Sequence, residues 1–139
     1  LSFGWSDLKL VGTAFVVYAL VALPLGLTVG FLAWRPDVSI GGLLVTPVVI
    51  YLITALPEEF LFRGVMQNLL MRYCGSKRGL AIAAIIFGVA HLPDLRYVLL
   101  ATLAGFAYGW VYLRTGKITA SALTHTSVNW IWGLLLSYP

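Results

Sequence analysis

The sequence predicts an all-α membrane protein, a polytopic bundle of about five transmembrane segments. Two observations on composition lead to this fold class: 60% of the 139 residues are hydrophobic, and only 10% are charged. A soluble domain carries about 25% charged residues, so the deficit points to a bilayer. The third observation is a series of long uncharged stretches. The length of the chain fits a single domain.

The first uncharged stretch runs from Leu10 to Trp34 and contains 25 residues. It is long enough to cross the hydrocarbon core with some tilt. We therefore expect residues 1–42 to form an N-terminal unit that consists of one transmembrane helix and the loop after it.

Four more membrane segments are expected in the rest of the chain. A long second helix is expected to enter near Ile40 to Leu43 and to run towards Tyr73. Pro57 lies inside it, and because proline lacks an N–H and suits a first helical turn, we expect the helix to break there. Glu58 would then begin a fresh helical segment. The remaining segments are expected at Leu80–Leu92, Tyr97–Leu113 and Thr119–Leu136.

The loops between these segments predict the orientation of the chain. The N-terminal flank, the 72–79 loop and the 114–117 loop share one side and hold six basic residues, whereas Arg35 and Arg96 lie on the other side. Because basic residues concentrate on the cytoplasmic side, we expect the N-terminus in the cytoplasm. The net charge of +4 then reflects topology, and no nucleic-acid partner is expected.

Polar side chains inside the apolar segments are the candidate functional residues. A charge at membrane depth costs roughly 2.5–3.5 kcal/mol on insertion scales, so such residues usually have a function. Counted back to the basic loops at 1.5 Å per residue, they lie at depths of about 12 to 21 Å, which predicts a common pocket. The candidates are Glu58, Glu59 and Arg63 on the second helix, His91 on the third, and His125 with Asn129 on the fifth.

The spacing of these residues predicts which of them share a helical face. Glu59 and Arg63 are four residues apart and can form an ion pair. Glu58 is rotated by about 100° from Glu59, so one acid can be neutralised structurally while the other stays free for chemistry. Two further pairs share a face in the same way: Phe87 with His91, and His125 with Asn129.

Such a pocket predicts hydrolysis by one of two mechanisms. Glu58 could act as a general base on a water, while a histidine and the Asn129 amide stabilise the oxyanion of an attacked carbonyl. Alternatively, Glu58, His91 and His125 could hold a zinc ion with water in the fourth position. The sequence lacks the HExxH metal motif, and the residues by themselves leave both mechanisms open.

Non-enzymatic functions also fit the same polar residues. Intramembrane glutamate and histidine mark ion pathways, so the chain could be a proton-coupled transporter or a substrate-binding scaffold. The sequence has no repeated halves of the kind found in many transporters. A further alternative is a bacteriocin-immunity protein that binds its target and keeps the polar motifs without turnover.

Three motifs in order carry a family likeness: Glu58-Glu59-x-x-x-Arg63, Phe87-x-x-x-His91 and His125-x-x-x-Asn129. This pattern resembles that of the CAAX-protease and bacteriocin-processing family, called CPBP or Abi, of intramembrane proteases. The likeness covers residues 43–136, which we expect to form the catalytic core.

The resemblance implies a helical intramembrane endopeptidase, in an integral membrane protein that we expect in the plasma membrane of a prokaryote. It also implies a role for each motif residue. Glu58 would be the water-activating acid with His91 as its partner, His125 and Asn129 would bind the oxyanion, and Glu59 with Arg63 would hold the second helix in place.

Partners and cofactors follow from the same likeness. Eukaryotic relatives process prenylated CAAX proteins, whereas bacterial relatives are linked to peptide processing and self-immunity. We therefore expect the lipid bilayer as surroundings and a peptide or membrane-protein substrate, prenylated or not, cut near the cytoplasmic side. The family is often labelled a metalloprotease, so Zn²⁺ stays open as a cofactor beside a metal-free glutamate mechanism.

Overall fold

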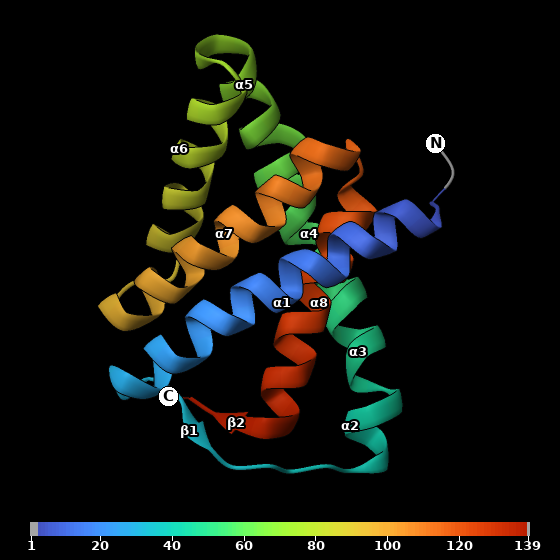
Figure 1. The fold of residues 1–139 in the computed structure, drawn as a ribbon, viewed down its shortest axis with the longest axis vertical. Coiled ribbons are helices and arrows are strands. Elements are labelled where there is room, and N and C mark those ends of the chain that lie inside the picture. The colour runs from blue at the N-terminus through green and yellow to red at the C-terminus, as the bar shows by residue number, and fades with distance from the viewer. Residues whose placement is uncertain (1–2, 139) are drawn as a thin grey trace.

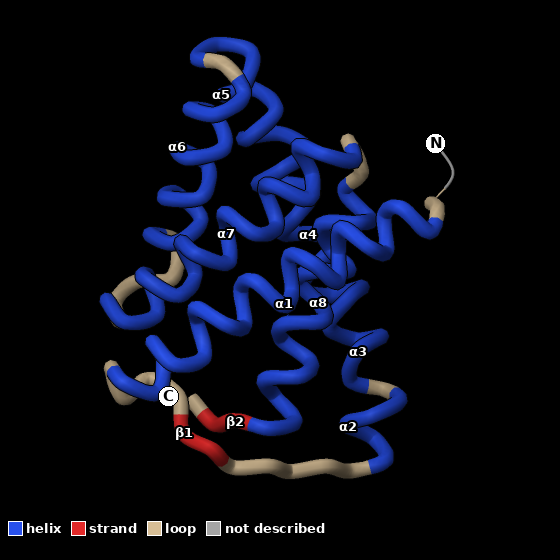
Figure 2. Tube along the Cα trace, in the orientation of Figure 1, coloured by secondary structure: helices blue, strands red, loops and turns tan. Residues whose placement is uncertain are grey.

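The computed structural model describes residues 3–138, and helices make up nearly all of the regular structure in that part (Figure 1 and Figure 2). The all-α class is thereby confirmed. Two short strands pair antiparallel and join the segment after the first helix to the end of the chain. The elements in chain order are α1 (Trp5–Thr28), β1 (Ala33–Trp34), α2 (Ile40–Leu44), α3 (Thr46–Val49), η1 (Ile50–Ala55), α4 (Leu56–Glu59), η2 (Phe60–Gln67), α5 (Asn68–Cys74), α6 (Ser76–Val89), α7 (Leu95–Thr115), α8 (Ile118–Leu135) and β2 (Leu136–Ser137).

Two of the described helices are long and apolar enough to cross a bilayer. They are α1, with 24 residues, and α7, with 21 residues, and the mean hydropathy over an 18-residue window is 2.2 in α1 and 1.2 in α7. Helix α1 also exposes large apolar side chains, such as Leu20 at 71%, which suits contact with lipid. The expected count of about five spans is not confirmed, because α6 has only 14 residues and the second helix is divided into short segments.

The helical backbone continues through Pro57, so the break expected there is not confirmed. Ala55 and Phe60, on either side of α4, both have helical backbone angles. What changes is the hydrogen-bond pattern, because the π-helical segments η1 and η2 flank the short α4. Pro57 is the second residue of α4, which follows η1 without a break. Wider π turns beside it accommodate the proline without ending the helix, and such turns are frequent at functional sites.

Glycines bring α6 and α7 into close contact. A Cβ added to Gly105 on α7 would lie 2.9 Å from the Cα of Ala84 on α6. A Cβ added to Gly88 on α6 would lie 2.8 Å from the carbonyl oxygen of Val98 on α7. Since neither position has room for a larger side chain, the two backbones pack against each other directly.

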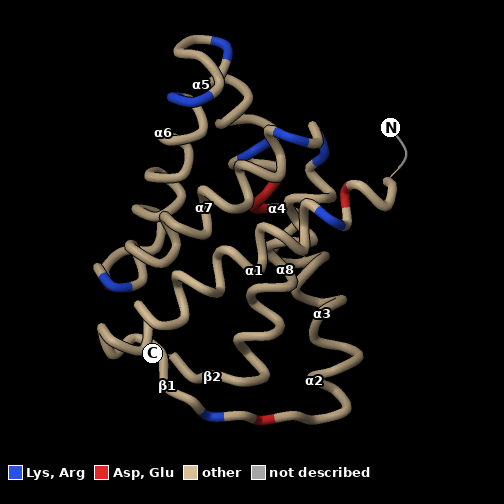
Figure 3. Tube along the Cα trace, in the orientation of Figure 1, with Lys and Arg blue, Asp and Glu red and all other residues tan. Residues whose placement is uncertain are grey.

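Contacts at the two ends of the bundle agree with the predicted grouping of the loops. At one end, Nζ of Lys117 lies 2.7 Å from Oδ2 of Asp7, which joins the start of α8 to the start of α1. At the other end, Nη1 of Arg96 donates to the carbonyl oxygen of Gly30 at 3.0 Å. Figure 3 shows most Lys and Arg residues around the first end, whereas Arg35 lies in the loop between β1 and α2 at the other.

Candidate active site

A cavity of about 60 Å³ lies among α1, α6, α7 and α8. A buried water needs roughly 10–15 Å³ of such space, so a few water molecules fit. Its walls include Phe87 on α6, His91 in the turn after α6, and His125 and Asn129 on α8. The structure therefore brings together three of the residues predicted to share a pocket. The other walls are mainly aromatic, among them Tyr18, Phe31, Tyr97, Tyr108, Trp132 and Tyr138.

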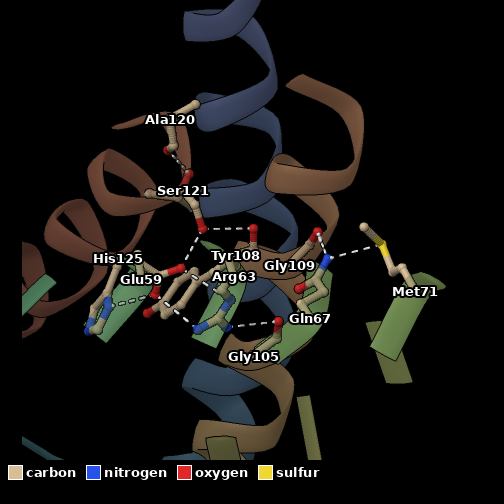
Figure 4. Close-up of polar contacts among 11 residues, drawn as sticks. Glu59, Arg63, Gln67, Met71, Gly105, Tyr108, Gly109, Ala120, Ser121 and His125 are labelled. Atoms are coloured by element: carbon tan, nitrogen blue, oxygen red, sulfur yellow. Dashed lines mark hydrogen bonds and ion pairs between the residues drawn. The ribbon is translucent and has the colours of Figure 1, made fainter. Parts of the chain in front are cut away.

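Glu59 and Arg63 form the ion pair that their spacing predicts, and both are buried (Figure 4). Nη1 of Arg63 donates to Oε1 of Glu59 at 3.1 Å. The Arg63 Nε atom lies 3.1 Å from Oε2, at ion-pair distance but without hydrogen-bond geometry. The other end of the guanidinium donates to the carbonyl oxygen of Gly105 at 3.1 Å, so the pair also ties η2 to α7.

The Glu59 carboxylate also holds α8. Ser121 donates from Oγ to Oε2 of Glu59 at 2.5 Å, and Nδ1 of His125 lies 3.0 Å from Oε1. Because a carboxylate accepts, Nδ1 of His125 carries the proton in this contact. The second ring nitrogen, Nε2, is then the one left for the cavity. The ring is further fixed by stacking on Tyr108, with 4.7 Å between the centroids and 14° between the planes.

His91 lies in the turn that follows α6, and a residue of α6 orients its ring. Its Nδ1 lies 2.7 Å from the carbonyl oxygen of Phe87, which can only accept, so Nδ1 donates. Nε2 of the neutral ring therefore has a free lone pair that can accept a proton. The ring packs edge-on against Tyr97 at a centroid distance of 4.5 Å, and this contact limits its rotation.

Glu58, which the sequence placed in the same pocket, is not among the residues that line the cavity. Its side chain is half-buried, and it forms no hydrogen bond or ion pair with residues 3–138. It interacts electrostatically with Arg63 and with Tyr97, a residue that does line the cavity. The sequence predicted one neutralised acid and one free acid, and the contacts of Glu59 and Glu58 follow that division.

The three residues considered as zinc ligands do not form a metal site in this structure. Within the described part of the chain, no three His, Cys, Asp or Glu side chains come close enough to hold a metal ion. Zinc needs at least three protein ligands around one point. As arranged, Glu58, His91 and His125 therefore do not fit a bound zinc ion.

Two polar residues of the buried network were not predicted from the sequence. Gln67 is fully buried, and its Nε2 donates to the carbonyl oxygen of Gly109 at 2.9 Å. Ser121 joins the network through Glu59. A spacing of four was the available signal, because Gln67 follows Arg63 by four residues and Ser121 precedes His125 by four. No such spacing pointed to the tyrosines that line the cavity.

The cavity adjoins a larger groove of about 550 Å³. The groove is lined by the segment from Asp37 to Thr54 and by the C-terminal part of α8. This end of the bundle is opposite the 72–79 and 114–117 loops in Figure 3. Those loops hold most of the basic residues, which predicts that their end is cytoplasmic. The groove and these basic loops therefore lie at opposite ends of the bundle, while the orientation of the N-terminus and the side of cleavage stay predictions.

Comparisons with known proteins agree with the motifs. The model of the family described as type II CAAX prenyl endopeptidase Rce1-like matches residues 40–131. The chain belongs to this family. A curated relative is the candidate membrane peptidase YdiL of Bacillus subtilis (strain 168), which is 32% identical over 72 residues. That match covers 52% of this chain and 29% of YdiL. No solved structure matches the chain.

The Rce1-like match extends from before Glu58 to beyond Asn129 and so includes all three motifs. The family resemblance drawn from those motifs is confirmed. Together with the two long apolar helices, family membership identifies an integral membrane protein.

Proposed function

We propose that this Rce1-like chain is an intramembrane endopeptidase that hydrolyses a peptide bond with a water activated by Glu58 and His91. The observation that carries the proposal is the cavity inside an apolar bundle, with His91, His125 and Asn129 in its walls. Helix α8 and the turn after α6 place these polar groups around a space that admits water. A lipid-facing or purely structural role would not need such an arrangement.

Water activation uses the two groups that have free acceptor atoms. Among residues 3–138, the Glu58 carboxylate has no hydrogen-bond partner, and Nδ1 is the ring nitrogen of His91 that is engaged, which leaves the lone pair of Nε2. One of them takes a proton from the water as its oxygen attacks the carbonyl carbon of the substrate. The same proton is then passed to the nitrogen of the departing amine as the C–N bond breaks. General acid–base catalysis of this kind contributes about 10²–10⁴-fold in rate.

The oxyanion of the tetrahedral intermediate needs donors, and the Asn129 amide supplies one. His125 can supply a second donor from Nε2 once its ring holds two protons. The Glu59 carboxylate, 3.0 Å from Nδ1, holds the His125 ring in place. Removal of one such donor typically costs about 10²–10³ in kcat. Glu59 and Arg63 thus position His125 and need not contact the substrate.

The substrate class that fits is a peptide or a membrane-protein segment in the bilayer. Whether it carries a prenyl group is a matter for experiment. Purified protein in lipid nanodiscs should be incubated with candidate peptides, with and without a farnesyl group, and the products identified by mass spectrometry. Release of a defined fragment that requires Glu58 and His91 supports the proposal, and an unchanged product yield in the Glu58→Gln protein contradicts it.

A further inference from the structure

The groove beside the cavity offers a path for the substrate chain. Three residues, Tyr97, Asn129 and Tyr138, line both spaces, so the groove and the cavity meet at these side chains. At about 550 Å³ the groove is far larger than the cavity of about 60 Å³. The cavity accommodates the water, and the groove has room for residues that flank the scissile bond.

The walls of the groove are fixed by hydrogen bonds between distant segments. Nε1 of Trp130 donates to the carbonyl oxygen of Gly42 at 2.8 Å, which ties α8 to α2. The backbone N–H of Asp37 donates to the carbonyl oxygen of Leu134 at 2.9 Å. Asp37 is therefore held at the rim by its backbone, while its side chain is exposed.

Asp37 is the one charged residue among the described residues that line the groove. Arg35, two positions earlier, does not line it. Asp37 also has no ion-pair partner within residues 3–138. Glu58 belongs to the active site, and the other acids of the chain are paired: Asp7 with Lys117, Glu59 with Arg63, and Asp94 with Arg96.

We propose that this groove binds the substrate segment next to the scissile bond and that Asp37 selects a lysine or arginine side chain in it. The inference rests on the proposed function, which makes the cavity the place of hydrolysis. A carboxylate that has no ion-pair partner among the described residues, on an otherwise uncharged wall, attracts a cationic side chain and repels an acidic one. Asp37 is thus a specificity residue that does not touch the reacting atoms.

The test measures binding apart from turnover. The host is the Glu58→Gln protein in nanodiscs, and the probes are fluorescent nonapeptides in which one position at a time carries Lys, Gln or Glu. Binding is followed by fluorescence polarisation. Asp37→Asn and Asp37→Lys are compared with Asp94→Asn, a matched control because Asp94 is an acid of a different loop. Arg96 donates to Asp94 and lowers the pKa of that carboxyl to about 2.

The expected result is a position at which Lys binds about three- to fivefold more tightly than Glu, as for a solvent-accessible ion pair. Asp37→Asn should remove that preference, Asp37→Lys should reverse it, and Asp94→Asn should keep it. Absence of binding, or a preference that ignores Asp37, overturns the inference. Cleavage by the Glu58-containing protein is measured separately, so peptides that bind with this preference and are never cut would refute the proposed function alone.

Discussion

Nδ1 of His125 lies 3.0 Å from Oε1 of Glu59, although the two residues are 66 positions apart in the chain. Both side chains are almost fully buried, at 5% and 0% exposure. The same carboxylate binds Arg63, so one buried group fixes α8 against the helical run that contains both glutamates. Glu59 is thus committed to structure, and the catalytic role proposed above is assigned to Glu58.

Replacing Glu59 by Gln should destabilise the fold strongly. The substitution removes a charge and leaves the Arg63 guanidinium buried without its counter-ion, which typically costs about 3–5 kcal/mol. The measurement is the unfolding free energy in mixed micelles. Glu58→Gln is the matched control, and it should change stability by less than about 1 kcal/mol because Glu58 has no ion pair among the described residues. An equal loss of unfolding free energy in the two variants would show that Glu59 has no larger structural role than Glu58.

Gly88→Ala should weaken the contact between α6 and α7. The added Cβ would lie 2.8 Å from the Val98 carbonyl oxygen, and overpacking of this kind costs about 1–3 kcal/mol. Thermal unfolding of the purified protein reports the change. For comparison, Gly12→Ala on α1 meets nothing within 4 Å and should be neutral or slightly stabilising. A Gly88→Ala protein as stable as the wild type would show that the helices can separate without cost.

Asn129→Ala should lower kcat by about 10²–10³-fold with little change in KM, because the amide is proposed to act on the oxyanion. Steady-state kinetics on a cleaved peptide separate the two constants. Ser127→Ala provides the control, since the Ser127 hydroxyl bonds to the Leu123 carbonyl oxygen and does not line the cavity. If KM rose while kcat stayed unchanged, Asn129 would be a substrate-binding residue instead.

Orientation can be decided with cysteine labelling, since Cys74 is the single cysteine of the chain and lies at the end of α5, beside the basic loop. The positive-inside rule predicts that a membrane-impermeant maleimide labels Cys74 only after cells are lysed. Asp37→Cys in a Cys74→Ser background should instead react in intact cells. The reverse labelling pattern would show that the distribution of basic residues predicts the wrong orientation in the membrane, and that the groove opens to the cytoplasm.

Local spacing was enough to predict part of this site. The Glu59–Arg63 pair depends on one helix alone, so a separation of four residues revealed it. Counting depth along the expected segments also predicted His91 and His125 in one pocket, and both line the cavity, whereas Glu58, predicted there by the same count, does not. The partner of Ser121 could not be predicted, since it depends on how α8 is rotated against α4. The helix continues at Pro57 between two π-helical segments, and no local sequence pattern predicts such segments.

The most direct test of the central claim is peptide cleavage in nanodiscs by the wild-type protein and by its Glu58→Gln variant, each with and without a chelator. The proposed mechanism predicts a defined product from the wild type, undiminished by chelator, and a loss of at least about 100-fold in the variant. A stability measurement on the same samples confirms that the variant is folded. Cleavage by Glu58→Gln at the wild-type rate would contradict the role of Glu58, and loss of wild-type activity with chelator would contradict the metal-free mechanism.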